Sequence, residues 1–309
     1  MASILGFSAY LPERVVANEE LAAQLGVEAS WILEACGIQE RRYAAPDQSV
    51  LDLAEGAARA CLERTGIGKG QLGAILVGTG TPDRSFPGVS ADLQAKLGAS
   101  DAFALDIHLA SAGGLVAMAL AVELCPKLGP VLVVGAERMS EVVQRHPAKE
   151  TTILFGDGAG ACVVVPGDGP YPVLDWKLGS DGSFAEDLSL VPGQALQMNG
   201  RQVIMQANRK LSGVVKELLE RHGIPGSSVE LFLFHQANLN LLRQVARNLG
   251  ADPAKVFVNL DLRGNTSAAS LLIAAAEAEA QGRLRPGMLA VLAAFGSGFT
   301  WGGMLLGPS

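Results

Sequence analysis

The sequence is poor in aromatic residues and in cysteine, and the spacing of its few cysteines limits the chemistry available. Aromatic residues make up 5% of the 309-residue chain, and four cysteines are spread along it with no CxxC pair: Cys36, Cys61, Cys125 and Cys162. This spacing disfavours a metal cluster or a disulfide framework. We therefore predict no metal site and expect the cysteines to be small buried hydrophobic residues.

Long apolar runs and an excess of positive charge are also missing. The chain has no stretch of about 18 consecutive apolar residues, and its opening residues, MASILGFSAYLPE, do not follow the pattern of a secretory signal peptide. The formal net charge of −7 gives no electrostatic basis for general binding to nucleic acid. These features predict a cytoplasmic protein without membrane insertion and without a nucleic-acid partner.

The apolar content is high, and its spacing alternates between helix and strand. Hydrophobic residues form 49% of the chain, enough for a large core. Apolar side chains recur at helical spacing from Ser49 to Cys61, and the apolar run GAILVGT follows from Gly73. Helices and strands in this order indicate an α/β fold.

An internal repeat divides the chain into two related parts. Residues 62–77, LERTGIGKGQLGAILV, align without a gap on residues 219–234, LERHGIPGSSVELFLF, at an offset of 157. The segments 128–137 and 285–295 are also alike. We therefore expect two copies of one α/β unit packed as one compact body, with halves 1–167 and 168–309. Residues 178–210 have no counterpart and are predicted to form a lid or a pocket insertion.

Three polar residues are predicted at the ends of strands. His235 follows the strand LFLF, Asn265 stands at a later strand-to-helix turn, and Ser111 occupies the matching turn of the first half. Because α/β folds place their sites at strand ends, these side chains define a candidate site. Each residue taken alone fits an ordinary structural role equally well, such as a helix cap for Ser111.

Two glycine-rich stretches, FGDGAGA and FGSGFTWGG, each lead into an apolar strand. A dinucleotide-binding loop instead runs from a strand through glycines into a helix. Close backbone packing is therefore the better interpretation of these glycines.

These motifs together resemble a known family. HQAN, GNTSAAS, ILFGDGAGA, AFGSGFTWG, the opening GFSAYLPERVVAN and WILEACGIQERR are similar to the thiolase-like condensing enzymes, and most closely to β-ketoacyl-acyl-carrier-protein synthase III. The resemblance runs from about residue 3 to residue 307. It implies a five-layered αβαβα fold and a homodimer. It also implies transfer of an acyl group from acyl-coenzyme A, a substrate rather than a permanently bound cofactor, followed by decarboxylative condensation with malonyl-carrier-protein.

The resemblance also assigns roles to single residues. The family uses a Cys-His-Asn triad, in which His and Asn hold the oxygen of the enolate that forms. His235 and Asn265 match the last two members, and the backbone N–H groups of residue 111 and Ser297 match a second oxyanion hole. The cysteine of the triad falls on Ser111, which is the main departure.

Three explanations of Ser111 remain open. It can be an engineered replacement of the cysteine that traps a bound ligand, or a natural nucleophile. It can also be natural and inert, which leaves an acyl-coenzyme A-binding partner subunit. A serine needs a base to remove its proton, whereas a cysteine reacts as its thiolate. His235 fits that role only if a free nitrogen faces Ser111. A natural serine also suits an acyltransferase of secondary metabolism that forms an ester, amide or thioester without decarboxylation.

Further positions bear on substrates and partners. Trp31 matches an aromatic residue that stacks on the adenine of coenzyme A, but the arginine expected one turn later is Ala35. Basic residues that dock carrier protein in relatives fall on Asn240 and Met205, whereas Arg243 and Arg247 share a helix face and can rebuild a basic patch. His108, where relatives carry a small residue, is either a core histidine or part of the acyl pocket. The other residues predicted to bind substrate are Lys149, Phe86, Met198, Val203, Ile204 and Asn238.

Overall fold

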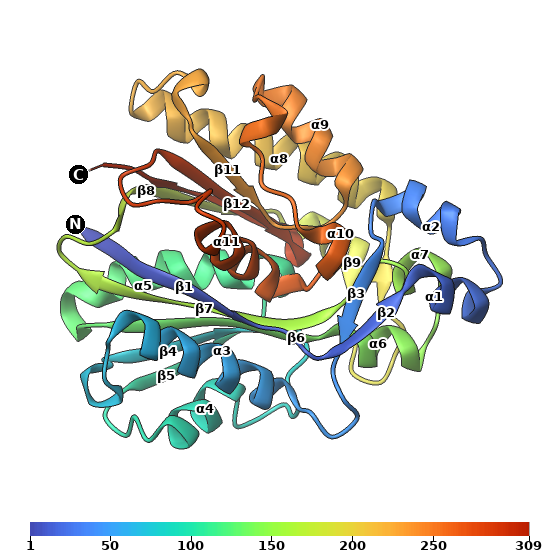
Figure 1. Ribbon diagram of the computed structural model, residues 1–309, viewed down its shortest axis with the longest axis horizontal. Helices are drawn as coiled ribbons and strands as arrows, with labels where there is room; N and C mark the ends of the chain where they lie inside the picture. Colours follow the sequence, from blue (N-terminus) through green and yellow to red (C-terminus); the bar gives the residue numbers. More distant parts are fainter. Residues whose placement is uncertain (309) are drawn as a thin grey trace.

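A computed structural model describes residues 1–308 as five stacked layers (Figure 1). Helices α8 and α9 form one outer layer, α3 and α4 form the other, and α5 and α11 lie between two layers of strands. The predicted αβαβα architecture is therefore confirmed.

Short 3₁₀ helices are labelled η. The elements of the first part are β1 (Ala2–Tyr10), β2 (Arg14–Ala17), α1 (Asn18–Leu25), α2 (Ala29–Cys36), β3 (Glu40–Tyr43), α3 (Val50–Thr65), η1 (Lys69–Gln71), β4 (Ala74–Gly78), α4 (Val89–Leu97), β5 (Phe103–Ile107), η2 (Ala110–Ala112), α5 (Gly113–Leu128), β6 (Val131–Arg138), α6 (Met139–Arg145), α7 (Lys149–Thr152) and β7 (Asp157–Pro166).

The second part repeats much of this order. Its elements are β8 (Tyr171–Ser180), η3 (Gly182–Asp187), β9 (Leu188–Ser189), β10 (Gln197–Met198), α8 (Gly200–Arg221), η4 (Gly226–Ser228), β11 (Leu231–Phe234), α9 (Leu239–Leu249), η5 (Pro253–Lys255), α10 (Leu260–Arg263), η6 (Ser267–Ala269), α11 (Ser270–Ala280), β12 (Ala290–Gly296), η7 (Ser297–Phe299) and β13 (Thr300–Leu306).

The two strand layers are continuous at one edge. The strand order is β11-β12-β13-β8-β1-β7-β6-β4-β5, because β1 pairs with β8 through Ala2, Ser3 and Ile4. Each half has the same pairing pattern, with β4 parallel to β6 and antiparallel β6–β7 in one, and β11 parallel to β12 and antiparallel β12–β13 in the other. The topology therefore repeats as the sequence does, while the exact division at residues 167 and 168 stays a prediction.

The offset of 157 seen in the sequence also relates local structures. The 3₁₀ turn η1 at Lys69–Gln71 corresponds residue for residue to η4 at Gly226–Ser228. The same offset relates Ala110 to Ser267, and these are the two non-glycine residues with positive φ among residues 1–308, at 42° and 46°. Matching turns thus precede both central helices, α5 and α11.

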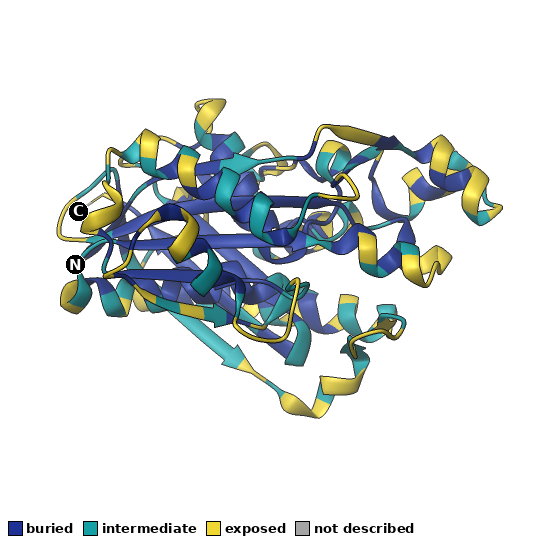
Figure 2. Ribbon diagram, turned by 90° about the horizontal axis from the view of Figure 1, so that it is seen from below, coloured by how far each residue is buried: buried dark blue, intermediate teal, exposed yellow. Residues whose placement is uncertain are grey.

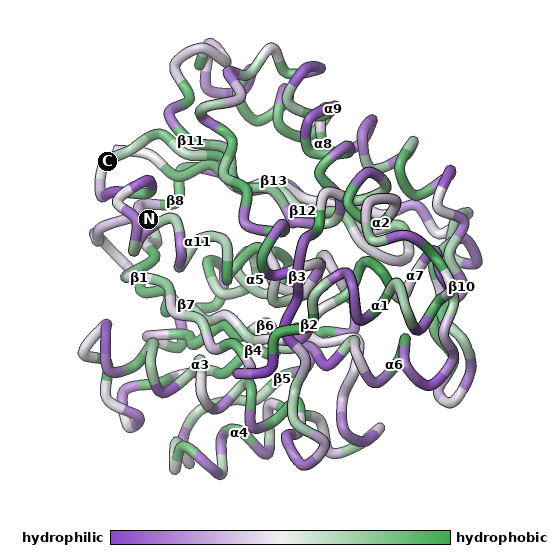
Figure 3. The backbone as a smooth tube through the Cα atoms, turned by 45° about the vertical axis from the view of Figure 1, so that its right-hand side comes forward, coloured by the Kyte–Doolittle hydropathy of each residue, from purple (hydrophilic) through white to green (hydrophobic). Residues whose placement is uncertain are grey.

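Burial follows the layers. Most strand residues and the helices α5 and α11 are buried, whereas exposed residues concentrate on the outer helices and the loops (Figure 2). Hydrophobic residues accordingly follow the central strands and these two helices (Figure 3). All four cysteines are buried and unpaired, as predicted.

Helix α3 shows how the outer helices are fixed. Ser49 caps its first turn in a reciprocal capping box with Asp52, which satisfies backbone N–H groups that the helix leaves free. Its buried residues include Leu53, Ala57 and Cys61, on the face predicted from the spacing. This face packs against the strand layer of the first half.

The stretch Ala110–Leu128 is long and apolar enough to span a membrane by length and composition, and 56% of its most apolar window is buried inside the protein. It contains α5, a core helix between the strand layers.

The glycine-rich stretches serve close packing, as predicted. A Cβ atom at Gly160 would lie 2.6 Å from Cβ of Leu272, and one at Gly302 would lie 2.5 Å from Cδ2 of Leu178. Both distances are shorter than any real contact, so neither site accepts a side chain without movement of its neighbours.

Candidate active site

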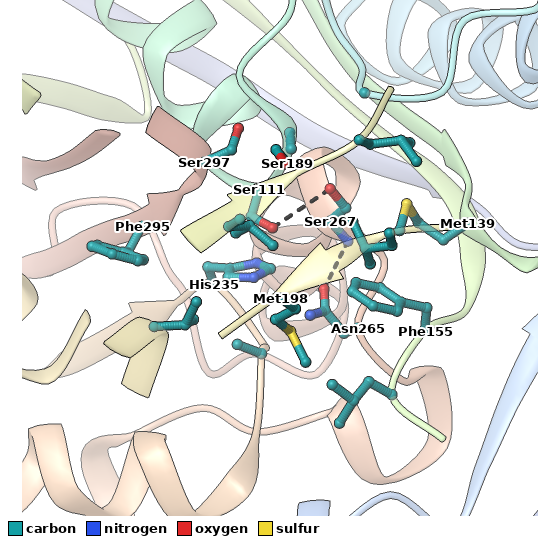
Figure 4. Close-up of a pocket in the computed structure, with 18 of the residues that line it drawn as sticks. Ser111, Met139, Phe155, Ser189, Met198, His235, Asn265, Ser267, Phe295 and Ser297 are labelled. Atoms are coloured by element: carbon teal, nitrogen blue, oxygen red, sulfur yellow. Dashed lines mark hydrogen bonds between the residues drawn. The ribbon is translucent and has the colours of Figure 1, made fainter. Parts of the chain in front are cut away.

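A cavity of about 610 Å³ lies where the two halves meet (Figure 4). Its wall is largely apolar, as is common for small-molecule sites. Residues from β9, β10 and the start of α8 cover one side, so the predicted insertion does line the pocket. Of the residues predicted from the sequence, those lining this cavity are Ser111, His235, Asn265, Ser297, His108, Met198, Val203, Ile204 and Asn238.

Ser111 lies in the turn η2 immediately before the 16-residue helix α5. The positive φ of 42° at the preceding Ala110 bends the backbone here. The Ser111 hydroxyl, which is half-buried, donates to Oγ of Ser267 at 3.5 Å (Figure 4). The free N–H groups and the dipole of a helix N-terminus favour negative charge at such a position.

The loop that carries Ser297 is pressed against this turn. A Cβ atom at Gly296 would lie 2.6 Å from the backbone nitrogen of Ala112 and 2.9 Å from the carbonyl oxygen of Leu109. Only glycine permits this approach, which brings the end of β12 beside Ser111. The oxyanion hole expected from the N–H groups of residues 111 and 297 stays a prediction.

His235 follows β11 and is 5% exposed. Its backbone N–H donates to the carbonyl oxygen of Ala293, and its Nδ1 lies 3.1 Å from Oγ of Ser270. The Ser270 hydroxyl also accepts the backbone N–H of Gln236 at 2.7 Å. Burial lowers the pKa of His235 from 6.5 to about 4, because the apolar surroundings disfavour the charged imidazolium. The imidazole is therefore neutral near pH 7.

This pKa makes a prediction about stability. Between pH 6.5 and 4 the unfolded chain binds a proton on this histidine that the folded chain does not bind, so folding loses stability as the pH falls. The quantity to compare is the free energy of unfolding of the wild type minus that of His235→Asn. We expect this difference to fall by about 3 kcal/mol between pH 7 and pH 4. Denaturant unfolding of both proteins at several pH values measures it. Ser111→Ala, which retains the histidine, serves as control, and parallel pH curves for the wild type and His235→Asn would contradict the assignment.

Asn265 is 6% exposed and stands just before η6. Its Oδ1 accepts the backbone N–H of Ser267 at 2.9 Å, and its own backbone N–H and carbonyl oxygen bond to Leu154 and Gly156. Because Oδ1 is held in this way, the amide nitrogen Nδ2 is left to donate into the cavity. His235 and Asn265 can thus present two neutral donors to one site (Figure 4).

Two residues that the sequence analysis did not single out complete the surroundings of Ser111. Ser267 is the hydrogen-bond partner of its hydroxyl. Glu137 lies behind Ser267 at the end of β6 and is fully buried. Ser267 lies within the motif GNTSAAS and at the offset of 157 from Ala110, so the repeat carries a signal for it. Glu137 has no comparable signal.

Five predicted residues lie outside the cavity wall. Phe86 is 86% exposed, Trp31 on α2 is 37% exposed, and Lys149, Arg243 and Arg247 are exposed as well. Helix α2 is bonded to the cavity mouth, because Nδ2 of Asn238 donates to the carbonyl oxygen of Ala35 at 3.0 Å. Trp31 therefore stands on a helix that contacts the cavity wall, although it does not line the cavity. The roles of these five residues stay predictions.

Cysteine chemistry is absent from the cavity. None of the four cysteines, all within the described part of the chain, lines it. Burial raises the pKa of their thiols, which keeps them protonated and unreactive. Over residues 1–308, no group of three or more His, Cys, Asp or Glu side chains is arranged to hold a metal ion.

Five layers in two topologically matched halves, with His, Asn and a hydroxyl at strand ends around one cavity, define a thiolase-like condensing enzyme. Residues 105–182 match the family described as 3-oxoacyl-[acyl-carrier-protein (ACP)] synthase III, and residues 219–307 match its C-terminal part. The β-ketoacyl-[acyl-carrier-protein] synthase III of Ehrlichia canis (strain Jake) is 37% identical over 313 residues, with 98% of each chain covered. The chain belongs to the β-ketoacyl-[acyl-carrier-protein] synthase III family, whose members are acyl-transferring condensing enzymes.

Solved structures agree with this membership. The crystal structure of 3-oxoacyl-[acyl-carrier-protein] synthase III from Aquifex aeolicus VF5 has a TM-score of 0.95 at 35% identity, with 99% of both chains covered. The priming β-ketosynthase from the R1128 polyketide biosynthetic pathway has a TM-score of 0.93 at 30% identity, with 100% of this chain and 97% of the other covered.

Proposed function

We propose that this protein takes an acyl group from acyl-coenzyme A onto Ser111 and condenses it with malonyl-carrier-protein. The observation that carries the proposal is the convergence of Ser111, His235 and Asn265 on one largely apolar cavity. Acyl-coenzyme A is the substrate of the first step and no permanently bound cofactor takes part. The protein acts in the cytoplasm.

In the first step the Ser111 oxygen attacks the thioester carbonyl. An acyl-oxygen bond forms, the carbon–sulfur bond breaks, and coenzyme A leaves as its thiol. The backbone N–H groups of Ser111 and Ser297 hold the developing oxyanion, and the positive end of α5 adds to this stabilisation.

In the second step a malonyl thioester loses carbon dioxide. His235 Nε2–H and Asn265 Nδ2–H donate to the thioester oxygen as the enolate forms. Ser270 supports this tautomer, because its oxygen accepts from Gln236 and its hydrogen is free for Nδ1 of His235. The enolate carbon then attacks the acyl carbon on Ser111, the acyl–oxygen bond breaks to release the β-ketoacyl product, and a proton from water restores the Ser111 hydroxyl.

A natural serine explains the departures better than an engineered trap does. A trap replaces the nucleophile alone, whereas this chain also departs from the family pattern at Ala35, His108, Asn240 and Met205. Nδ2 of Asn240 donates to the carbonyl oxygen of Glu34 at 3.2 Å, so the side chain has a structural task in place of docking.

We further propose that the cavity mouth takes an acidic carrier protein. Arg243 and Arg247 lie on the exposed face of α9, the helix that follows Asn238 at the mouth, and they form no ion pair within residues 1–308. Two unpaired guanidinium groups near the opening fit an acidic partner.

Charge reversal tests this docking surface. We expect Arg243→Glu/Arg247→Glu to raise the KM for malonyl-carrier-protein about tenfold or more while leaving the KM for acyl-coenzyme A unchanged. Steady-state kinetics in low and high salt measure both values, and the same reversal at Arg59, on α3 in the opposite outer layer, serves as control. Equal KM values for the carrier protein would exclude this face as the docking surface.

We also propose a homodimer formed through β5. This strand pairs only with β4 and closes one end of the strand order among residues 1–308. Phe103 and Leu105 on it are 53% and 37% exposed, and Phe86 lies exposed in the loop between β4 and α4. An apolar edge strand of this kind supports pairing with a second copy.

Product analysis separates the main candidate from its alternative. We expect a β-ketoacyl product and release of carbon dioxide when the protein is supplied with acyl-coenzyme A and malonyl-carrier-protein. Ser111 favours a second candidate, because an oxyester is a poorer electrophile for condensation than a thioester. That candidate, an acyltransferase of secondary metabolism, forms an ester, amide or thioester from a non-malonyl acceptor without carbon dioxide. An inert binding subunit would give neither product.

A further inference from the structure

A serine nucleophile needs a base, and His235 is poorly suited to that role. Its pKa of about 4 makes it a weak proton acceptor near pH 7, and the tautomer that donates from Nε2 to an enolate presents no free nitrogen to Ser111. The only hydrogen bond of the Ser111 side chain within residues 1–308 runs to Ser267. Ser267 is therefore the group placed to receive the proton of the Ser111 hydroxyl.

Ser267 is buried, 2% exposed, and lies between the nucleophile and a buried carboxylate. Its oxygen accepts the Ser111 hydroxyl at 3.5 Å, so its own hydrogen points elsewhere. Hydrogen bonding from the Ser267 side chain is one of the interactions that favour the charged form of Glu137. The backbone N–H of the next residue, Ala268, donates to Glu137 at 3.3 Å, which places Ser267 between Ser111 in the cavity and the Glu137 carboxylate behind it (Figure 4 shows the bond from Ser111 to Ser267).

Glu137 is held in a fixed position. Its carboxylate accepts the backbone N–H of Gly80 at 2.9 Å, the hydroxyl of Thr81 at 2.6 Å and the backbone N–H of Ala268 at 3.3 Å. The groups that face it are hydroxyls and amides from the β4 loop and from η6, with no charged side chain among them in residues 1–308. Burial raises its pKa above the ordinary value for a glutamate, which makes it a better proton acceptor.

We propose that Ser267 and Glu137 form a proton relay that activates Ser111, an inference that rests on the proposed function of Ser111 as nucleophile. As the Ser111 oxygen bonds to the acyl carbon, its proton passes to Ser267, and the proton of Ser267 passes to Glu137. When the carbon–sulfur bond breaks, Ser267 gives a proton to the coenzyme A thiolate and regains one from Glu137. The net transfer is one proton from Ser111 to coenzyme A. Ser267 contacts the leaving group in this scheme, whereas Glu137 is a positioning residue, since it acts through Ser267.

The test compares serine and cysteine at position 111. A cysteine at a helix N-terminus reacts as its thiolate and needs no relay at the moment of attack. We expect Ser267→Ala and Glu137→Gln to slow single-turnover acylation of Ser111 by about 100-fold or more. In the Ser111→Cys protein the same two changes are expected to alter acylation less than about threefold. Alanine suits the backbone at 267, because Ala110 already adopts the same positive φ at the matching turn.

A pH profile separates a relay from mere support of the fold. The rate of acylation of the wild type should fall as the pH drops through the pKa of Glu137. This acidic limb of the pH profile should disappear in Glu137→Gln. Removing the Thr81 hydroxyl with Thr81→Val takes away a donor that favours the carboxylate, so the limb should move to higher pH.

The outcomes are distinct. Equal slowing in the serine and cysteine proteins would make Ser267 and Glu137 structural and overturn the relay, as would unchanged acylation of Ser111 in both variants. In either case acylation of wild-type Ser111 would leave the proposed function standing. If wild-type Ser111 is never acylated while Ser111→Cys is, the proposed role of the serine fails and the relay fails with it.

Discussion

Replacing Ser111 with cysteine is expected to raise the rate of β-ketoacyl product formation by about 100-fold, which equals about 2.7 kcal/mol of activation free energy. Two effects act in the same direction. The thiolate is the stronger nucleophile in the first step, and the N-terminus of α5 favours its formation. The acyl thioester that it forms is also the better electrophile for the second step.

Steady-state product formation from acyl-coenzyme A and malonyl-carrier-protein measures this effect. Ser111→Ala is the matched control, because it removes the nucleophile and retains the rest of the cavity, and it should form no acyl-enzyme. A Ser111→Cys protein that forms no β-ketoacyl product would rule out the condensing reaction. A gain in acylation without a gain in condensation would instead favour transfer to a non-malonyl acceptor.

Replacing either His235 or Asn265 with alanine should lower the rate of the condensation step by about 100- to 1000-fold, because one donor is then lost from an oxyanion hole. The test is best made in the Ser111→Cys protein, where condensation is fast enough to follow. Acylation by acyl-coenzyme A should change much less, because the enolate oxygen that these donors hold does not exist in that step.

Separate readouts make this prediction specific. Release of labelled carbon dioxide reports the decarboxylation, and the acylated fraction of the protein reports the first step. His222→Ala, at the end of α8 and remote from the cavity wall, is the control for loss of a histidine. If His235→Ala slows acylation and condensation equally, His235 acts on the nucleophile and the division of roles proposed above is wrong.

The repeat explains why so much of the fold was predictable. The offset of 157 is matched in structure by η1 and η4, which lie within the two aligned segments, and it extends beyond them to the positive-φ residues Ala110 and Ser267. Apolar spacing was enough to place α3 from Ser49 onward, and the capping box at Ser49 is a feature that the structure adds. These features are local, so the sequence carries them directly.

The surroundings of Ser111 were less predictable, because they depend on contacts between distant segments. Glu137 and Ser267 come from β6 and η6, and only the packing of the two halves brings them together behind Ser111. The pKa of His235 likewise depends on its burial, which the motif HQAN does not specify. Asn240 is a further example, since only the structure reveals that it bonds to the end of α2.

The central claim is that Ser111 carries the acyl group. The most direct test is the intact mass of the protein after incubation with acyl-coenzyme A substrates from acetyl to long-chain, with fragmentation to locate any adduct. We expect this role to give one acyl group on Ser111 with at least one of these substrates, and no adduct in Ser111→Ala. An unmodified wild-type protein with every substrate, together with an adduct on residue 111 in Ser111→Cys, would contradict it and would mean that the serine disables a condensing enzyme.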